Sequence, residues 1–304
     1  MDVLAIFGPT GVGKTAVAVA VAALLRARGE EPVAISCDAI QVYRGLATLS
    51  GAATPRDRAR LEHRLVGFVE PSEEFSAGRF AALAHAEIDA LLAEGCRPIV
   101  VGGTGLYLRA ALADLELRPP VPAGVRDEVE REIADRGPEA MHGELDPDAA
   151  AAVHPRDRKR IARSLELQRA GLDPPRDSKQ LWTARMRHPT TLVGLVLDRE
   201  ELGARIDARV DEMVAAGAPQ EARGAADAGA SRTARAALGF DELLAGDIEA
   251  VKRAHRAYAR RQLTWMRRMT RVELIDRTNR TVDDVARQIV GLLGENEASM
   301  ERVR

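Results

Sequence analysis

Residues 3–28 read VLAIFGPTGVGKTAVAVAVAALLRAR, and this stretch decides the fold. Val3–Phe7 is a short apolar run typical of a buried strand, and residues 14–28 carry an Ala/Val/Leu pattern without a helix breaker. Between them, residues 8–15 match the pattern G-x-x-x-x-G-K-[ST] in full. Strand, tight loop and helix therefore follow one another, the context in which this motif forms a phosphate-binding loop, or P-loop.

Each residue type in the predicted P-loop has a physical role. The glycines let backbone N–H groups converge on phosphate oxygens, and the start of the helix adds positive potential. Lys14 supplies a positive charge, and the hydroxyl of Thr15 can bind Mg²⁺. We therefore predict a site for a phosphorylated ligand with Mg²⁺ as cofactor. Its residues are Gly8, Pro9, Thr10, Gly11, Val12, Gly13, Lys14 and Thr15.

The rest of the chain continues the alternation of strand and helix. Val33–Ser36 and Ile99–Val101 are predicted strands, the second preceded by a predicted helix over Ala77–Ala93. Leu192–Leu197 is a further strand-like run, and after Asp198 the pattern is helical to the end. The fold class is therefore α/β, a parallel P-loop sheet of the NTPase type flanked by helices.

Prolines mark a change of texture in the middle of the chain. Pro119, Pro120 and Pro122 open a charged helical stretch, and Pro174–Pro175 lie near the end of another. We expect residues 113–188 to form a helical insertion domain. Residues 1–112 and 189–304 are then the P-loop core with a helical C-terminal region.

Composition sets limits on function. The chain has 304 residues, 46% hydrophobic and 30% charged, with a formal net charge of -2, which describes a soluble globular protein. A nucleic-acid site must therefore come from local clusters of Arg and Lys. No apolar run is long enough for a bilayer span, and Cys37 and Cys96 form no metal-ligand pair. We expect a cytoplasmic protein, without a membrane partner, that is a monomer.

Two polar residues follow predicted strands, at the edge where open α/β sheets hold their ligands. Asp38 comes just after the second strand, and its carboxylate could take a proton from an attacking group. Thr104 follows two glycines after the third, and its hydroxyl could approach a leaving oxygen. Position alone leaves a helix or turn cap open for Asp38 and turn chemistry open for Thr104.

A basic run lies near the C-terminus. Between Glu249 and Glu273 there is no acidic residue and there are eight Lys and Arg residues. On a helix, five of the arginines line one side, while Tyr258, Trp265 and Met269 fall roughly opposite. Such a side can contact phosphates, although most charge runs are simply solvated surfaces. The five arginines are Arg253, Arg256, Arg260, Arg267 and Arg271.

Five motifs, in family order and across nearly the whole chain, resemble bacterial tRNA dimethylallyltransferases, also called tRNA isopentenyltransferases. They are GPTGVGKT (8–15), DAIQVYRG (38–45), VGGTGLYLRA (101–110), HPRDRKRIARSLEL (154–167) and RRQLTWMR (260–267). The resemblance implies that dimethylallyl diphosphate occupies the P-loop. It implies that the prenyl acceptor is the N6 amine of the adenosine directly 3′ of the tRNA anticodon, position 37.

The resemblance also implies roles for single residues. Asp38 matches the base for the N6 amine, Thr104 the threonine near the bridging oxygen of the departing diphosphate, and Arg209 an arginine that assists the leaving group. Matches to the tRNA-contacting segments complete the set. The residues implied to bind tRNA are Asp38, Ala39, Ile40, Gln41, Thr104, Arg126, Lys159, Arg160, Ile161, Ala162, Arg163, Arg235, Gly239 and Phe240.

Two departures and three alternatives accompany this interpretation. The family usually has Asp-Ser where this chain has Asp38-Ala39, and a lysine-containing element where residues 51–55 stand. An isopentenyltransferase acting on free adenine nucleotides would share the P-loop and Asp38. A P-loop small-molecule kinase would use Lys14 to bind ATP. An RNA-binding protein with an inactive site is the non-enzymatic alternative.

Overall fold

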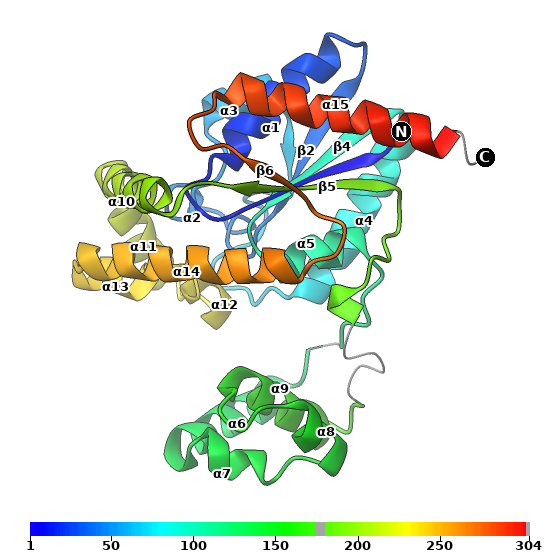
Figure 1. Ribbon diagram of the computed structural model, residues 1–304. Helices are drawn as coiled ribbons and strands as arrows, with labels where there is room; N and C mark the ends of the chain where they lie inside the picture. Colours follow the sequence, from blue (N-terminus) through cyan, green and yellow to red (C-terminus); the bar gives the residue numbers. More distant parts are fainter. Residues whose placement is uncertain (119, 174–179, 302–304) are drawn as a thin grey trace. The chain divides into compact units, whose positions relative to one another are not determined.

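The computed structural model describes residues 1–118, 120–173 and 180–301. It divides into two compact units, one of Met1–Leu115 with Leu181–Arg304 and one of Glu116–Gln180. Both are drawn in Figure 1. Pro119 and Pro174–Pro175, which contribute to the predicted boundaries of the insertion, lie outside the described residues.

A parallel sheet of six strands forms the centre of the larger unit, in the order β3-β2-β4-β1-β5-β6. The strand that precedes the P-loop lies inside the sheet, between β4 and β5, and all five of its residues are buried. The strands are β1 (Val3–Phe7), β2 (Glu31–Cys37), β3 (His63–Arg64), β4 (Cys96–Gly102), β5 (Thr190–Val196) and β6 (Glu273–Asp276). The predicted α/β fold with a parallel sheet is confirmed.

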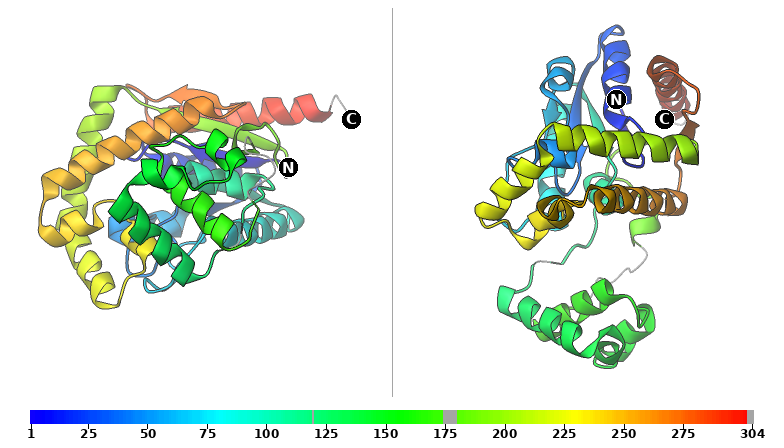
Figure 2. Two further views of the ribbon diagram at one scale, coloured as in Figure 1. Left: turned by 90° about the horizontal axis from the view of Figure 1, so that it is seen from below. Right: turned by 90° about the vertical axis from the view of Figure 1, so that its left-hand side faces the viewer.

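Helices cover both faces of the sheet (Figures 1 and 2). On one face α1 and α15 pack against each other, and on the other α4 packs against α5. Helix α14, of 21 residues, contacts α10 and α5. The helices of this unit are α1 (Lys14–Arg26), α2 (Ala47–Ser50), α3 (Pro55–Arg60), α4 (Ala77–Ala93), α5 (Gly105–Leu112), α10 (Arg199–Ala215), α11 (Ala218–Asp227), α12 (Arg232–Arg235), α13 (Phe240–Ala245), α14 (Ile248–Arg268) and α15 (Val282–Glu301).

The main core joins the sheet to α1 and α15. Side chains such as Ile6, Val17, Leu195 and Ile289 are fully buried in one cluster. Because a parallel sheet is covered on both faces, its inner strands read as continuous apolar runs, which is why β1 and β5 were recognisable in the sequence. The packed sheet holds the loops at its carboxyl edge in place.

The prediction that the chain is helical throughout after Asp198 is wrong at Glu273–Asp276, which forms the edge strand β6 beside β5. Only Ile275 of the four residues is buried. A four-residue strand with one inward side chain gives neither a continuous apolar run nor a clear alternation, so no sequence pattern marks it.

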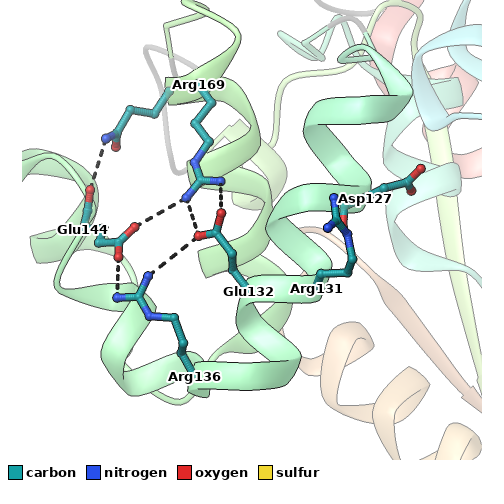
Figure 3. A network of polar contacts seen from close by, with 7 residues as sticks. Asp127, Arg131, Glu132, Arg136, Glu144 and Arg169 are labelled. Carbon is teal, nitrogen blue, oxygen red and sulfur yellow. Dashed lines mark hydrogen bonds and ion pairs between the residues drawn. The ribbon is translucent and has the colours of Figure 1, made fainter.

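The smaller unit is helical and has its own core. Its helices are α6 (Ala123–Arg136), α7 (Pro138–His142), α8 (Pro147–Ala152) and α9 (Arg158–Arg169). Val129, Met141 and Ile161 are fully buried between them. At the surface, Arg169 contacts the carboxylates of Glu132 and Glu144, and Arg136 pairs with the same two groups (Figure 3). This network connects α6 and α9 to the segment after α7.

Candidate active site

The polar residues singled out in the sequence meet at one edge of the sheet. Gly8 directly follows β1, Asp38 directly follows β2, and Thr104 comes two residues after β4. These three strands are neighbours in the order β2-β4-β1 and run parallel, so their carboxyl ends lie side by side. Ligands of open α/β sheets bind at this edge.

The P-loop has the backbone that its glycines allow. Gly11 and Gly13 adopt φ values of 80° and 86°, in the left-handed region that side-chain-bearing residues avoid. Gly13 precedes α1 without a side-chain cap, so the N–H groups of the first turn are available to an anion. The Nζ of Lys14 donates hydrogen bonds to the carbonyl oxygens of Gly8 (2.9 Å) and Pro9 (3.0 Å). Lys14 thus lies across the loop.

The Lys14 amine gives up its proton more readily than an ordinary lysine does. Burial, with the positive charge of Arg209 as the next cause, lowers the pKa of its amine to about 8, although the charge of Asp38 acts in the opposite direction. Two cations held this close repel each other unless an anion lies between them. The pair is therefore suited to a ligand with several negative charges, such as a diphosphate.

The two oxygens of the Asp38 carboxylate have different partners. Its Oδ1 accepts hydrogen bonds from the backbone N–H of Ile40 (2.9 Å) and Gln41 (3.4 Å) and so holds the turn after β2. Its Oδ2 accepts a hydrogen bond from Thr104 Oγ1 at 3.4 Å. The turn-cap role left open by the sequence is therefore real, and it occupies only one oxygen. Burial raises the pKa of Asp38, which favours proton uptake.

Thr104 stands at the start of α5, but its hydroxyl does not cap this helix. The hydroxyl instead lies between Asp38 Oδ2 and the phenolic oxygen of Tyr258, which is 3.1 Å away on α14. Burial, with the charge of Asp38 as the next cause, raises the pKa of Tyr258 to about 12, so that its hydroxyl stays protonated. Thr104 is thus available for chemistry at the site.

Arg209 reaches the same region from α10. Its guanidinium donates a hydrogen bond to the carbonyl oxygen of Gly51 at 3.2 Å. Gln41 Nε2 lies 3.4 Å from the same oxygen, and Gln41 Oε1 accepts a hydrogen bond from Ser36 at 2.7 Å. A Cβ on Gly51 would clash with the Arg209 guanidinium, so a larger residue there would displace this side chain. This contact connects α10 to Gly51 at the end of α2, which Gln41 also contacts.

Gln262 is a residue of the site to which the sequence assigned no role. It is buried on α14, and its Oε1 accepts a hydrogen bond from the Thr10 backbone N–H at 2.8 Å. Its Nε2 donates to the Gly103 carbonyl oxygen, also at 2.8 Å. One amide thus joins the P-loop to the loop that carries Thr104. The sequence signal was an amide at a buried helix position, aligned with Val251, His255, Ala259 and Met266.

Arg277 is a second residue that the sequence did not reveal. It directly follows β6, is buried, and donates a hydrogen bond to the Val12 carbonyl oxygen. A Cβ on Gly13 would meet its guanidinium at 2.0 Å. Arg277 therefore supports the P-loop through its backbone and brings a positive charge near it.

The basic run lies on α14, but not all of its charges are available to a partner. Lys252 pairs with Asp211 at 2.8 Å, and Arg256, one of the five arginines expected on one side, pairs with Asp207. Both acids come from α10 and neutralise these two cations. The helix ends at Arg268. The exposed arginines are Arg253, Arg260, Arg261, Arg267 and Arg268 on the helix and Arg271 after it.

Within the smaller unit, the segment 159–163 separates into two groups. Lys159 and Arg160 are exposed and Arg163 is half-buried, so their side chains can reach a partner. Ile161 and Ala162 are buried in the core of this unit. Helix periodicity turns their side chains toward α6, so any contact they make with tRNA would be through the backbone, and their predicted tRNA binding stays a prediction.

Arg126 and Arg163, both expected to contact tRNA, converge on one buried acid. Arg126 Nε lies 3.3 Å from Glu166 Oε1, and Arg163 Nη1 lies 3.0 Å from Glu166 Oε2. Glu166 thus fixes both guanidinium groups in one place on this unit.

The segment 235–240 differs from the expectation. Arg235 is exposed and pairs with Asp241 at 2.7 Å, and Gly239 takes φ 84° at the start of α13. Phe240 is fully buried, although the sequence suggested a ring that stacks on a base. The ring belongs to the core, so of the three residues predicted to bind tRNA here only Arg235 has an exposed side chain. Ala39 and Ile40, by contrast, are half-buried in the turn at Asp38.

Three further features bear on function: the acidic residue after β5, possible metal ligands and possible membrane-spanning helices. Asp198, which follows β5, accepts hydrogen bonds from the N–H groups of Glu200 and Glu201 and caps α10. Among the described residues, no group of three or more His, Cys, Asp or Glu is placed to hold a metal ion. No helix in the described ranges has the length and apolar character that spanning a bilayer requires.

Together, the fold and this edge define a P-loop protein with a proton acceptor and a hydroxyl beside its anion site. The family model described as IPP transferase matches residues 41–269, and the one described as isopentenyl transferase matches residues 1–80. The chain belongs to the IPP transferase family.

Similar proteins agree with this assignment. A tRNA dimethylallyltransferase of Anaeromyxobacter sp. (strain Fw109-5) is 42% identical over 299 residues, covering 94% of this chain and 98% of the relative. One of Geobacillus kaustophilus is 37% identical, with 96% and 97% covered. The crystal structure of a tRNA isopentenylpyrophosphate transferase from Bacillus halodurans matches with a TM-score of 0.70 at 32% identity, covering 99% of each chain. The resemblance found in the sequence is confirmed.

Proposed function

We propose that this chain transfers a dimethylallyl group from dimethylallyl diphosphate to the N6 amine of the adenosine 3′-adjacent to the tRNA anticodon. The product is N6-(dimethylallyl)adenosine. The observation that carries the proposal is the hydrogen bond between Thr104 and Asp38 Oδ2 beside the cations Lys14 and Arg209. A proton acceptor beside two cations is the arrangement that this transfer requires.

The diphosphate end of the donor binds the P-loop. The N–H groups at the start of α1 and the amine of Lys14 meet its oxygens, and Lys14 gives up its own loop carbonyls to do so. Thr15, the second residue of α1, would hold Mg²⁺ together with the diphosphate oxygens, since Mg²⁺ commonly binds through substrate phosphates. The ion would offset negative charge on the leaving group.

In the transfer step, the N6 nitrogen attacks the allylic carbon while the bond from this carbon to the bridging oxygen breaks. The electron pair leaves with the diphosphate, and the N6 proton passes to Asp38 Oδ2. Thr104 donates its hydroxyl proton in a hydrogen bond to the bridging oxygen, and Lys14 and Arg209 stabilise the growing negative charge. The Oδ1 contacts keep the carboxylate oriented throughout.

The tRNA would meet the exposed cations. On the larger unit these are the exposed arginines of α14 and Arg235, and on the smaller unit Lys159 and Arg160, together with the half-buried Arg126 and Arg163. Such contacts fix the position of an RNA backbone without reading sequence. Gln41, beside Asp38, can form hydrogen bonds with an adenine edge once the base is turned out of the anticodon stack. A cytoplasmic location as a monomer accords with this role.

A direct test measures transfer of label from radiolabelled dimethylallyl diphosphate, with Mg²⁺, to an unmodified tRNA that carries A next to the anticodon. AMP and ATP compete as acceptors in the same reaction. We expect label in the tRNA alone. Label in the nucleotides would assign the chain to acceptors of the free-adenylate class, and phosphate transfer from ATP without prenyl transfer would assign it to the kinases.

The low pKa of Lys14 predicts a pH dependence for binding of inorganic diphosphate. Lys14 must be protonated to attract the anion, so its contribution to the affinity should be constant well below pH 8 and fall above it. The fall approaches about tenfold per pH unit. Lys14→Arg keeps its charge at high pH, so the ratio of wild-type to variant affinity, measured calorimetrically in the same buffers, should fall above pH 8. A constant ratio would contradict this role of Lys14.

A further inference from the structure

Tyr258 touches the reacting end of the site without belonging to any of the predicted binding segments. It lies on α14 one turn before Gln262, and its phenolic oxygen is 3.1 Å from Thr104 Oγ1. The Thr104 hydroxyl therefore has a hydrogen-bonding neighbour on each side, Tyr258 and Asp38.

The direction of these hydrogen bonds follows from the available protons. A threonine hydroxyl has one proton to donate and lone pairs that accept, whereas an ionised carboxylate only accepts. Thr104 must therefore donate to Asp38 Oδ2, and the proton between Thr104 and Tyr258 must come from the phenol. Tyr258 is half-buried beside a carboxylate, which keeps the phenol protonated.

We propose that Tyr258 is a positioning residue of the transfer reaction, whose hydroxyl donates to Thr104 Oγ1 and thereby makes Thr104 a hydrogen-bond donor. With its lone pair engaged by Tyr258, Thr104 directs its own proton away from α14, toward Asp38 or toward the bridging oxygen of the diphosphate. A hydroxyl that accepts a hydrogen bond is also a stronger donor. This inference rests on the proposed function.

Helix α14 contributes both to the Thr104 loop and to the exposed basic surface. Gln262, one turn after Tyr258, fixes the loop before Thr104 through the Gly103 carbonyl oxygen. The same helix presents exposed arginines such as Arg260 and Arg261 to solvent. One helix therefore positions both the Thr104 loop and the Thr104 hydroxyl.

A double-mutant cycle tests the inference. Tyr258→Phe should lower kcat of the wild-type enzyme about 3- to 10-fold, the range expected for one neutral hydrogen bond, with little change in KM for dimethylallyl diphosphate. In a Thr104→Ala background the same change should alter kcat less than about twofold, because the partner is already gone. In a Thr104→Ser background, which keeps the hydroxyl, the full effect should return.

Equal effects of Tyr258→Phe in the wild-type and Thr104→Ala backgrounds would overturn the inference, since a purely structural role acts without Thr104. Tyr43→Phe is the matched control, because its hydroxyl bonds Glu73 and Thr233 instead. If Tyr258→Phe does not fold by thermal melting, the comparison uses 3-fluorotyrosine at position 258, whose more acidic phenol should raise kcat only when Thr104 is present. An inactive wild type refutes the proposed function instead.

Discussion

Asp38→Asn is expected to lower kcat for prenyl transfer to tRNA by about 10²- to 10⁴-fold, the usual contribution of a general base. The amide cannot take the N6 proton. Its oxygen can still accept the backbone hydrogen bonds that Asp38 Oδ1 receives from Ile40 and Gln41, so the turn should survive. Single-turnover rates at saturating donor and acceptor measure the effect, and tRNA affinity should stay close to that of the wild type.

Asp57→Asn is the matched control, because Asp57 caps α3 together with Thr54 and takes no part in the site. It should retain the wild-type rate. An Asp38→Asn enzyme with more than about a third of wild-type kcat would exclude Asp38 as the base.

The pH profile gives a second readout of Asp38. A base must be deprotonated to act, so the wild-type rate should fall as the pH drops through the pKa of Asp38. Burial raises that pKa above the ordinary range of a carboxyl group, so the fall should begin at a higher pH than for an exposed aspartate. The residual rate of Asp38→Asn should lack this acidic limb.

Much of the fold was readable from the sequence because motif and periodicity agreed. Val3–Phe7 and the P-loop are local in sequence, and a fully buried parallel strand is apolar along its whole length. The helix predicted over Ala77–Ala93 has the same bounds in the structure. Strand β6 was not predicted, because it pairs with β5 about 80 residues earlier in the chain and only one of its own four side chains is buried.

The sequence predicted a site residue only where a reactive side chain or a known motif follows a recognisable strand. Asp38 and Thr104 follow strands and carry reactive groups, so they stood out. Tyr258, Gln262 and Arg277 lie more than 150 residues from Thr104 and support it, or the P-loop, through contacts that only the folded chain creates. Spacing along the chain does not reveal such partners.

The resemblance assigns tRNA contacts to whole segments, and the structure shows that their side chains differ in accessibility. Residues 159–163 form one turn and more of α9, so some of their side chains must face the core of the smaller unit, and Ile161 and Ala162 do. Phe240 is likewise part of the core. A match predicts which segment meets RNA, and burial shows which of its side chains are accessible.

Arg209→Gln is expected to lower kcat by about 10²- to 10³-fold, the cost of removing one preorganised group that stabilises a developing anion. Glutamine is shorter than arginine, so the variant also loses the hydrogen bond that Arg209 donates to the Gly51 carbonyl oxygen at 3.2 Å, and the effect of the charge has to be separated from the effect on this loop. Arg205→Gln, one turn earlier on α10 and paired with Glu201, is the control and should remain active.

The variant also makes a prediction about Lys14 that separates an electrostatic role from a structural one. The charge of Arg209 lowers the pKa of Lys14, so its removal should raise that pKa above about 8. The decline in diphosphate affinity at high pH should then begin at a higher pH in Arg209→Gln than in the wild type. A slower enzyme whose binding profile against pH is unchanged would mean that Arg209 acts on the loop at Gly51 and not on the anion. A shifted profile together with reduced kcat would place the Arg209 charge at the leaving diphosphate.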